Sequence, residues 1–255
     1  MKNLLFTLAL LISFSFLSHS QKNELRESIL FGHNGAYGKY DNGQYTHRVN
    51  ITDGKKQGEE IGYFLSGEVG YIVNYADGIR QGEFVMYHES GKLHHKVNYI
   101  DGKEQGKEIY YYESGKVGSK VNYVDGKLQG EAIGYYESGK LHHKVNYIDG
   151  KEQGKEIYYY ENGKVNIKTN FVDGKKQGRK IVYYESGKVG SKENYVNGSP
   201  QGEALSYYES GVVRYKGNYV DGKLQGELIT YYESGEIKKI DNYIDGLLIY
   251  NFGED

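Results

Sequence analysis

The sequence predicts an all-β protein: an elongated, single-layer, twisted antiparallel meander or solenoid of 24-residue β-hairpin repeats. Three observations predict this class. An Asp-Gly or Asn-Gly dipeptide recurs every 24 residues from position 53 to position 246. A Ser-Gly or Asn-Gly dipeptide recurs with the same period from position 42 to position 235. Between these turn signals, side chains alternate with the period of two that is typical of β-strands.

The first strand of each repeat is represented by residues 131–137, EAIGYYE. Ile133 and Tyr135 alternate there with Gly134 and Tyr136, so successive side chains are expected on opposite faces of a strand. The strand is rich in aromatic and β-branched residues, which favour pleated structure.

The Ser-Gly dipeptide at 138–139 is expected to form a two-residue hairpin loop. Such a loop places Glu137 opposite Lys140, an ion pair that would help to set the register. The return strand then extends over residues 140–148. Segment 149–154, DGKEQG, is expected to turn the chain again, because its glycines supply positive φ.

The predicted sheet has two mixed faces, neither fully apolar nor fully polar. One carries Ile133, Tyr135, Lys144, Asn146 and Ile148; the other carries Ala132, Gly134, Tyr136, Leu141, His143, Val145 and Tyr147. Such a sheet has little core of its own, so each repeat is expected to pack against its neighbours through rows of aromatic side chains.

The ends of the chain differ from the repeats. Lys2, an apolar stretch and small residues before Gln21 form a secretory signal pattern, with cleavage expected near Ser20-Gln21. The sequence therefore predicts a secreted, periplasmic or cell-envelope protein without a transmembrane segment. The predicted organisation is a signal peptide at 1–20, an N-terminal cap or linker at 21–38, about nine repeats at 39–246 and a C-terminal tail at 247–255.

Composition excludes several classes of function. The chain has no Cys, which excludes disulfides, thiolate metal sites and a cysteine nucleophile. Its net charge of −2 gives no basic excess for nucleic acid. No cofactor is predicted.

Candidate catalytic and metal-binding groups also favour a structural interpretation. The pairs His94-His95 and His142-His143 point to opposite faces of their strands, and the two pairs lie roughly 19 Å apart at the usual strand spacing. The Ser of the Ser-Gly turns is replaced twice by Asn, which no nucleophile would tolerate. The sequence therefore predicts no catalytic residue, no metal site and no enzymatic activity.

Two rows of tyrosines follow the repeat. The first accompanies an aliphatic residue two positions earlier and is expected to pack within the sheet. The second is the candidate binding surface, because Tyr combines apolar area with a polar tip; stacking within the sheet is the alternative. Its members are Tyr112, Tyr136, Tyr160, Tyr184, Tyr208 and Tyr232.

Four segments carry a family resemblance. They are DGKLQGEAIGYYESGKL (125–141), DGKEQGKEIYYYENGKV (149–165), DGKKQGRKIVYYESGKV (173–189) and DGKLQGELITYYESGEI (221–237). This pattern resembles MORN repeats, and in particular the variant found in bacterial YwqK-type antitoxins. The resemblance implies a β-hairpin array that binds other proteins, with an antitoxin-like or immunity-like role.

These observations together predict an exported, non-enzymatic repeat scaffold that mediates protein–protein binding. The alternative is a glycan or cell-envelope attachment module that uses the Tyr-rich sheet surface. Capture of one stoichiometric protein partner would favour the first, and binding to immobilised glycan the second.

Overall fold

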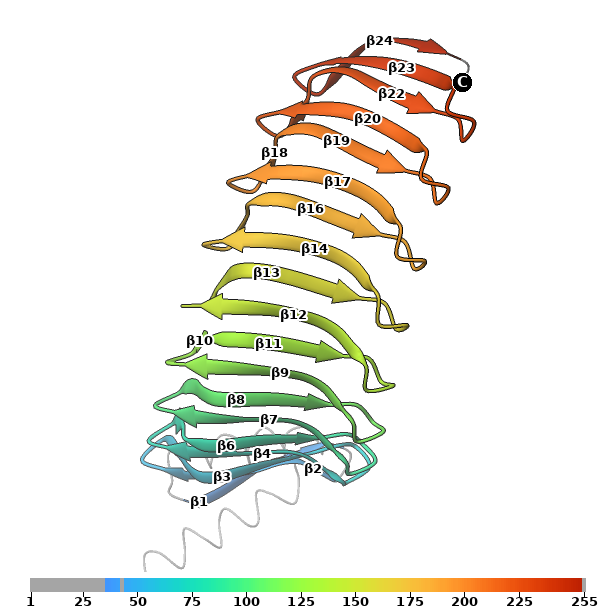
Figure 1. Ribbon diagram of the computed structural model, residues 1–255. Helices are drawn as coiled ribbons and strands as arrows, with labels where there is room; N and C mark the ends of the chain where they lie inside the picture. The colour runs from blue at the N-terminus through green and yellow to red at the C-terminus, as the bar shows by residue number, and fades with distance from the viewer. Residues whose placement is uncertain (1–34, 42–43, 254–255) are drawn as a thin grey trace, which may run out of the picture. The chain divides into compact units, whose positions relative to one another are not determined.

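The computed structural model of the protein describes residues 35–41 and 44–253 (Figure 1). These residues form antiparallel β-structure, and no helix occurs among them. The predicted all-β hairpin fold is confirmed. The predicted signal peptide at 1–20 lies outside the described residues. The chain divides into two compact units, the first ending at Gln105 and the second beginning at Gly106.

The first unit is a meander in which each strand pairs antiparallel with the strand that follows it along the chain, apart from one short strand beside a bulge. Its strands are β1 (Gly35–Asp41), β2 (Gln44–Thr52), β3 (Lys55–Tyr63), β4 (Val69–Ala76), β5 (Ile79–Arg80), β6 (Gly82–Tyr87) and β7 (Leu93–Ile100).

The second unit continues the same pattern, with hairpins side by side in Figure 1 from green to red. β8 (Lys103–Tyr111) contains the boundary between the units. The remaining strands are β9 (Val117–Val124), β10 (Lys127–Leu128), β11 (Gly130–Tyr135), β12 (Leu141–Ile148), β13 (Lys151–Tyr159), β14 (Val165–Val172), β15 (Lys175–Lys176), β16 (Gly178–Tyr183), β17 (Val189–Val196), β18 (Ser199–Pro200), β19 (Gly202–Tyr207), β20 (Val213–Val220), β21 (Lys223–Leu224), β22 (Gly226–Tyr231), β23 (Ile237–Ile244) and β24 (Leu247–Gly253).

The Asp-Gly dipeptides form tight two-residue turns. Asp149 and Gly150 have φ of 51° and 80°, and Ile148 pairs with Lys151 on either side of them. Positive φ at both central residues is the type I′ geometry, which matches the twist of the flanking strands. The turn predicted over 149–154 is therefore too long, because the chain re-enters the sheet at Lys151.

The Gln-Gly step that follows each turn is a bulge within the strand. Leu128 pairs with Tyr123, whereas Ile133 pairs with Lys120, so the strand carries two extra residues between these pairs. Gly130 has φ of 82° there. A glycine is suited to this position because residues with a Cβ rarely adopt that conformation.

The Ser-Gly hairpins differ from their prediction by one residue. The N–H of Tyr136 donates to the carbonyl of Lys140, and the N–H of Gly139 donates to the carbonyl of Tyr136, both at 2.8 Å. The loop is therefore the three residues 137–139, with Gly139 at φ 89°, and Tyr136 rather than Glu137 faces Lys140. A type I turn closed by a left-handed glycine is a common three-residue hairpin.

A compensating bulge restores the register beyond this loop. Tyr135 pairs with Leu141, but Gly134 pairs with His143, so His142 is an extra residue. The strand bodies therefore keep the predicted division of residues between two faces.

Neighbouring repeats are joined by hydrogen bonds at the strand ends where the Asp-Gly turns lie. The N–H of Gly150 donates to the carbonyl of Leu128 at 2.9 Å, and the N–H of Asp149 donates to Gln129 Oε1 at 2.9 Å. The Gln of each Gln-Gly step thus holds the next turn along the array. The same bond joins Gln81 to Asp101, Gln153 to Asp173, Gln177 to Asn197, Gln201 to Asp221 and Gln225 to Asp245.

The most deeply buried side chains occupy one position of the return strand. Val49 and Val73 in the first unit, and Val145 in the second, are 1–2% exposed. Each lies in the middle of its strand, 24 residues or a multiple of 24 from the others. These valines form a buried row on one face of the sheet, and Tyr99, Ala132 and Phe171 are buried as well.

We expect Val145→Ala to lower the free energy of unfolding of the second unit by about 2 kcal/mol, because it leaves a cavity in this row. Val124, which is 44% exposed in the preceding return strand, provides the matched control. Val124→Ala should cost about 0.5 kcal/mol or less. Urea denaturation followed by far-ultraviolet circular dichroism measures both, and equal losses would contradict a core at Val145.

Candidate functional site

The two faces of the sheet differ in how strictly they repeat. In the second unit, one face presents three rows of nearly constant residues, and we call it the constant face. It carries a Lys row, an Asn row and an aliphatic row: Lys120, Lys144, Lys168, Lys192 and Lys216; Asn122, Asn146, Asn170, Asn194, Asn218 and Asn242; Ile109, Ile133, Ile157, Ile181, Leu205 and Ile229. The position that pairs with the Asn row of this face changes between basic residues such as Lys155 and acidic residues such as Glu131.

The opposite face, which contains the buried row, changes from repeat to repeat, and we call it the variable face. Two facing positions in each hairpin define it. The pairs are Glu108–Val121, Ala132–Val145, Glu156–Thr169, Lys180–Glu193, Ala204–Gly217 and Leu228–Asp241. Between them, these two backbone positions hold acidic, basic, apolar and glycine residues from one hairpin to the next.

An acidic cluster lies on the variable face over β12–β14. His143 Nε2 contacts Glu156 Oε1 at 3.1 Å, and the His143 ring stacks on Tyr158 with 4.1 Å between ring centroids. Burial raises the pKa of Glu152, and the negative charge of Glu156 raises it further. Within residues 35–41 and 44–253, no three His, Asp or Glu side chains are arranged to hold a metal ion.

A mixed-charge cluster follows over β15–β17. The hydroxyl of Tyr195 donates to Glu193 Oε2 at 2.8 Å, and Lys180 Nζ contacts the same oxygen at 3.6 Å. Burial and the hydrogen bond to Glu193 raise the pKa of Tyr195 to about 12. The ammonium group of Lys176 lies 5.3 Å from the centre of the Tyr195 ring, within the range of a cation–π contact.

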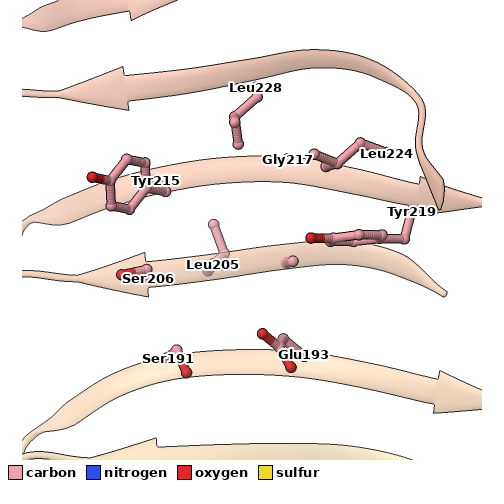
Figure 2. Close-up of a pocket in the computed structure, with 10 residues that line it drawn as sticks. Ser191, Glu193, Leu205, Ser206, Tyr215, Gly217, Tyr219, Leu224 and Leu228 are labelled. Atoms are coloured by element: carbon pink, nitrogen blue, oxygen red, sulfur yellow. The ribbon is translucent and has the colours of Figure 1, made fainter. Parts of the chain in front are cut away.

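A pocket of about 220 Å³ opens on the variable face over β17–β22 (Figure 2). Gly217 lies opposite Ala204, so the position that is valine in the repeats up to Val145 has no side chain here. This departure is visible in the sequence as KGNYV in place of KVNYV, and the sequence prediction missed it. The walls include Ala204, Tyr215, Tyr219, Leu224 and Leu228.

A second hollow of about 420 Å³ lies in the first unit, at the Ser-Gly hairpin loops. Phe64 and His88 line it, and both stand where later repeats place the second tyrosine. The His88 and His94 rings lie 4.4 Å apart there. Tyr71 and Met86, which face each other in neighbouring strands, also line this hollow.

The tyrosines predicted as a binding surface join neighbouring repeats. The hydroxyl of Tyr136 donates to the carbonyl of Tyr159 at 2.6 Å, and that of Tyr160 donates to Tyr183 at 2.7 Å. Tyr232 in the last repeat is 40% exposed. A role of this row in binding a partner stays a prediction. The remaining bonds of the row join Tyr112 to Tyr135, Tyr184 to Tyr207 and Tyr208 to Tyr231.

The rings of this row also pack on the return strand of their own hairpin. The centroid of the Tyr136 ring lies 4.5 Å from that of His142, and the Arg214 guanidinium lies 5.6 Å from the centre of the Tyr208 ring. Gly118 takes this position beneath Tyr112, where a Cβ would stand 3.3 Å from the ring. Gly190 lies beneath Tyr184 in the same way, so the residue under the tyrosine changes among Gly, His and Arg along the array.

Comparison with known protein families identifies the repeat. A family described as MORN repeat variant matches residues 80–101, 104–125, 128–149, 152–173, 176–197, 200–221 and 224–245. The chain belongs to the MORN repeat variant family. Each match covers 22 residues of the 24-residue period. MORN repeats are in general modules that bind proteins or membranes.

No curated protein matches the chain significantly. The crystal structure of TcdB2-TccC3-Cdc42 is 13% identical, with a TM-score of 0.20, and the match covers 84% of this MORN repeat protein and 17% of that chain. The Tc holotoxin pore of Photorhabdus luminescens is 12% identical, with a TM-score of 0.19, over 79% of this chain and 14% of that one. This chain thus spans less than a fifth of either.

In the part of the chain that the structure describes, no helix has the length and apolar character needed to cross a bilayer.

Tyr136→Phe and Tyr136→Ala separate the two contributions of the tyrosine row. Phe keeps the ring against His142 but removes the hydrogen bond to the next repeat, so we expect a loss of about 1 kcal/mol in the free energy of unfolding. Ala also removes the ring and should cost about 3 kcal/mol or more. Urea denaturation checks both values. A neutral Tyr136→Phe would show that the hydroxyl does not stabilise the array.

The contact between Tyr195 and Glu193 predicts how the pKa of Tyr195 and the stability of the fold depend on pH. Because the pKa of Tyr195 is raised in the fold, its contribution to stability is present below pH 10 and is lost as the pH rises towards 12. Glu193→Gln removes the carboxylate but not the burial, so the pKa should fall while staying above that of a free tyrosine. Carbon-13 NMR of the labelled Tyr195 ring measures it. An unchanged pKa would contradict the contact.

Proposed function

We propose that this MORN repeat protein is an exported, non-enzymatic scaffold that binds another protein through the variable face of residues 106–253. One observation carries the proposal: the Lys, Asn and aliphatic rows of the constant face keep nearly the same residues, whereas the facing pairs of the variable face change in charge, size or polarity from each hairpin to the next. A fold needs only the repeated residues. A surface that distinguishes one partner from others needs residues that do not repeat.

The chemistry of the variable face suits a protein partner. It combines Tyr rings with separate acidic and mixed-charge clusters, and aromatic residues are enriched where proteins meet. Hydrogen bonds between repeats hold the strands that present these side chains, so little backbone freedom would be lost on binding. Complementary charges on a partner would then set its position along the array.

Export and the nature of the partner are the finer parts of the proposal. The signal pattern at residues 1–20 supports delivery to the cell envelope or the outside. The resemblance to YwqK-type antitoxins supports an immunity-like role, in which the partner is a toxin. Attachment to an envelope glycan through the Tyr-rich surface is the alternative that the same composition supports.

Affinity capture with the mature chain, 21–255, tests the proposal on envelope and secreted fractions of the source cells. A double variant of the variable face, Tyr158→Ser with Lys180→Ser, should weaken binding of the captured protein at least tenfold. The matched control is Lys144→Ser with Lys168→Ser on the constant face, which should bind as the parent does. Circular dichroism verifies that both variants fold.

Two results would overturn this function. Equal binding by both double variants would show that the variable face is not the interface. Retention of purified envelope glycan by the parent chain, with no protein captured, would favour the attachment module.

A further inference from the structure

The pocket on the variable face exists because a side chain is missing. Gly217 lies in β20 with extended backbone that any residue could adopt, so the backbone does not require glycine. A Cβ at this position would stand 3.0 Å from Leu228 Cδ1 and 3.3 Å from Leu224 Cδ2. Both atoms are the ends of flexible side chains. A larger residue could therefore be accommodated, but it would fill the pocket.

The pocket has the size and walls for one aromatic ring. A cavity of about 150 Å³ lined by aliphatic and aromatic side chains accepts benzene, and this one measures about 220 Å³. Tyr215 and Tyr219 lie two residues either side of Gly217 on the same strand face, and in Figure 2 the Tyr215 ring lies over β20 while the Tyr219 ring is seen edge-on between β20 and β19. Aromatic walls of this kind favour an aromatic occupant.

The polar groups of the pocket favour an occupant that donates a hydrogen bond. Glu193 lines the pocket together with Ser191 and Ser206. Among the described residues, Tyr195 and Lys180 both contact Glu193 at Oε2. The carboxylate can therefore accept a further hydrogen bond at its other oxygen. Its negative charge disfavours an anionic occupant.

We infer that this pocket receives a Tyr or Trp side chain of the protein partner, with the ring between Tyr215 and Tyr219 and its O–H or N–H directed at Glu193. The inference rests on the proposed function, since it names the anchor residue of that interface. Aromatic anchors in pockets commonly carry much of the binding energy of protein complexes.

The probe is p-cresol, which has the side chain of tyrosine without its backbone. In the mature chain with carbon-13-labelled leucine methyl groups, p-cresol should shift the Leu224 and Leu228 resonances saturably at millimolar concentration. Gly217→Val, which restores the residue of other repeats, should abolish these shifts. Thr169→Val is the matched control, because it makes the same residue in the same buried row outside the pocket, and it should leave the shifts unchanged.

A second probe tests the hydrogen bond. 4-Methylanisole has the same ring but no donor, so it should bind several-fold more weakly than p-cresol. Equal affinity would remove Glu193 from the recognition.

The outcomes separate the pocket from the proposed function. If p-cresol leaves the Leu224 and Leu228 resonances unchanged, or shifts them equally in Gly217→Val, the pocket does not bind aromatic rings. If a captured protein partner binds Gly217→Val as tightly as the parent, the pocket is not its anchor site. If p-cresol binds as expected but no protein is captured, the pocket stands and the protein-binding function fails.

Discussion

The second unit depends on hydrogen bonds that join neighbouring repeats at both ends of their strands. At one end a Gln accepts from the backbone of a turn 20 residues further along, and at the other a Tyr hydroxyl donates to a carbonyl 23 residues further along. Each bond is worth only about 1 kcal/mol, but its geometry fixes the step between repeats. An inserted or deleted residue would break both the Gln and the Tyr hydrogen bonds at that repeat. The period of 24 residues is therefore kept throughout.

Because the hydrogen bonds at the strand ends stabilise the array, the residues on one face of the sheet can change from repeat to repeat. Across the variable face of the second unit, the same facing pair is Ala132–Val145 in one hairpin and Lys180–Glu193 in another. A lone buried charge would be costly, but Lys180 and Glu193 compensate each other at 3.6 Å. The array thus tolerates side chains that an ordinary core would reject, because no single pair holds the sheet together.

Much of this fold follows from the sequence because its turns are local. Asp-Gly favours positive φ at both residues, so the places of these turns and the division into two faces were predicted, although the turn at 149–150 is shorter than the predicted segment 149–154. Ser-Gly is less decisive, because it fits a two-residue loop as well as the three-residue loop observed at 137–139. The bonding of Gln129 and Tyr136 to the next repeat depends on partners 20 and 23 residues away, which local propensity does not reveal.

The candidate site was hidden for a different reason. A search for reactive residues looks for side chains that can act as acids, bases or nucleophiles. Gly217 has no side chain, so such a search does not select it. Elsewhere in this row, valines such as Val97 and Val145 are 2% exposed, so a repeat with glycine gives up core packing worth about 2 kcal/mol. The hydrogen bonds between repeats are kept on both sides of this repeat, from the N–H of Asp221 to Gln201 and from the hydroxyl of Tyr208 to the carbonyl of Tyr231. These bonds offset that loss. In a periodic sheet, the loss of one side chain can form a pocket in a single repeat, because hydrogen bonds to the adjacent repeats keep the destabilised repeat folded.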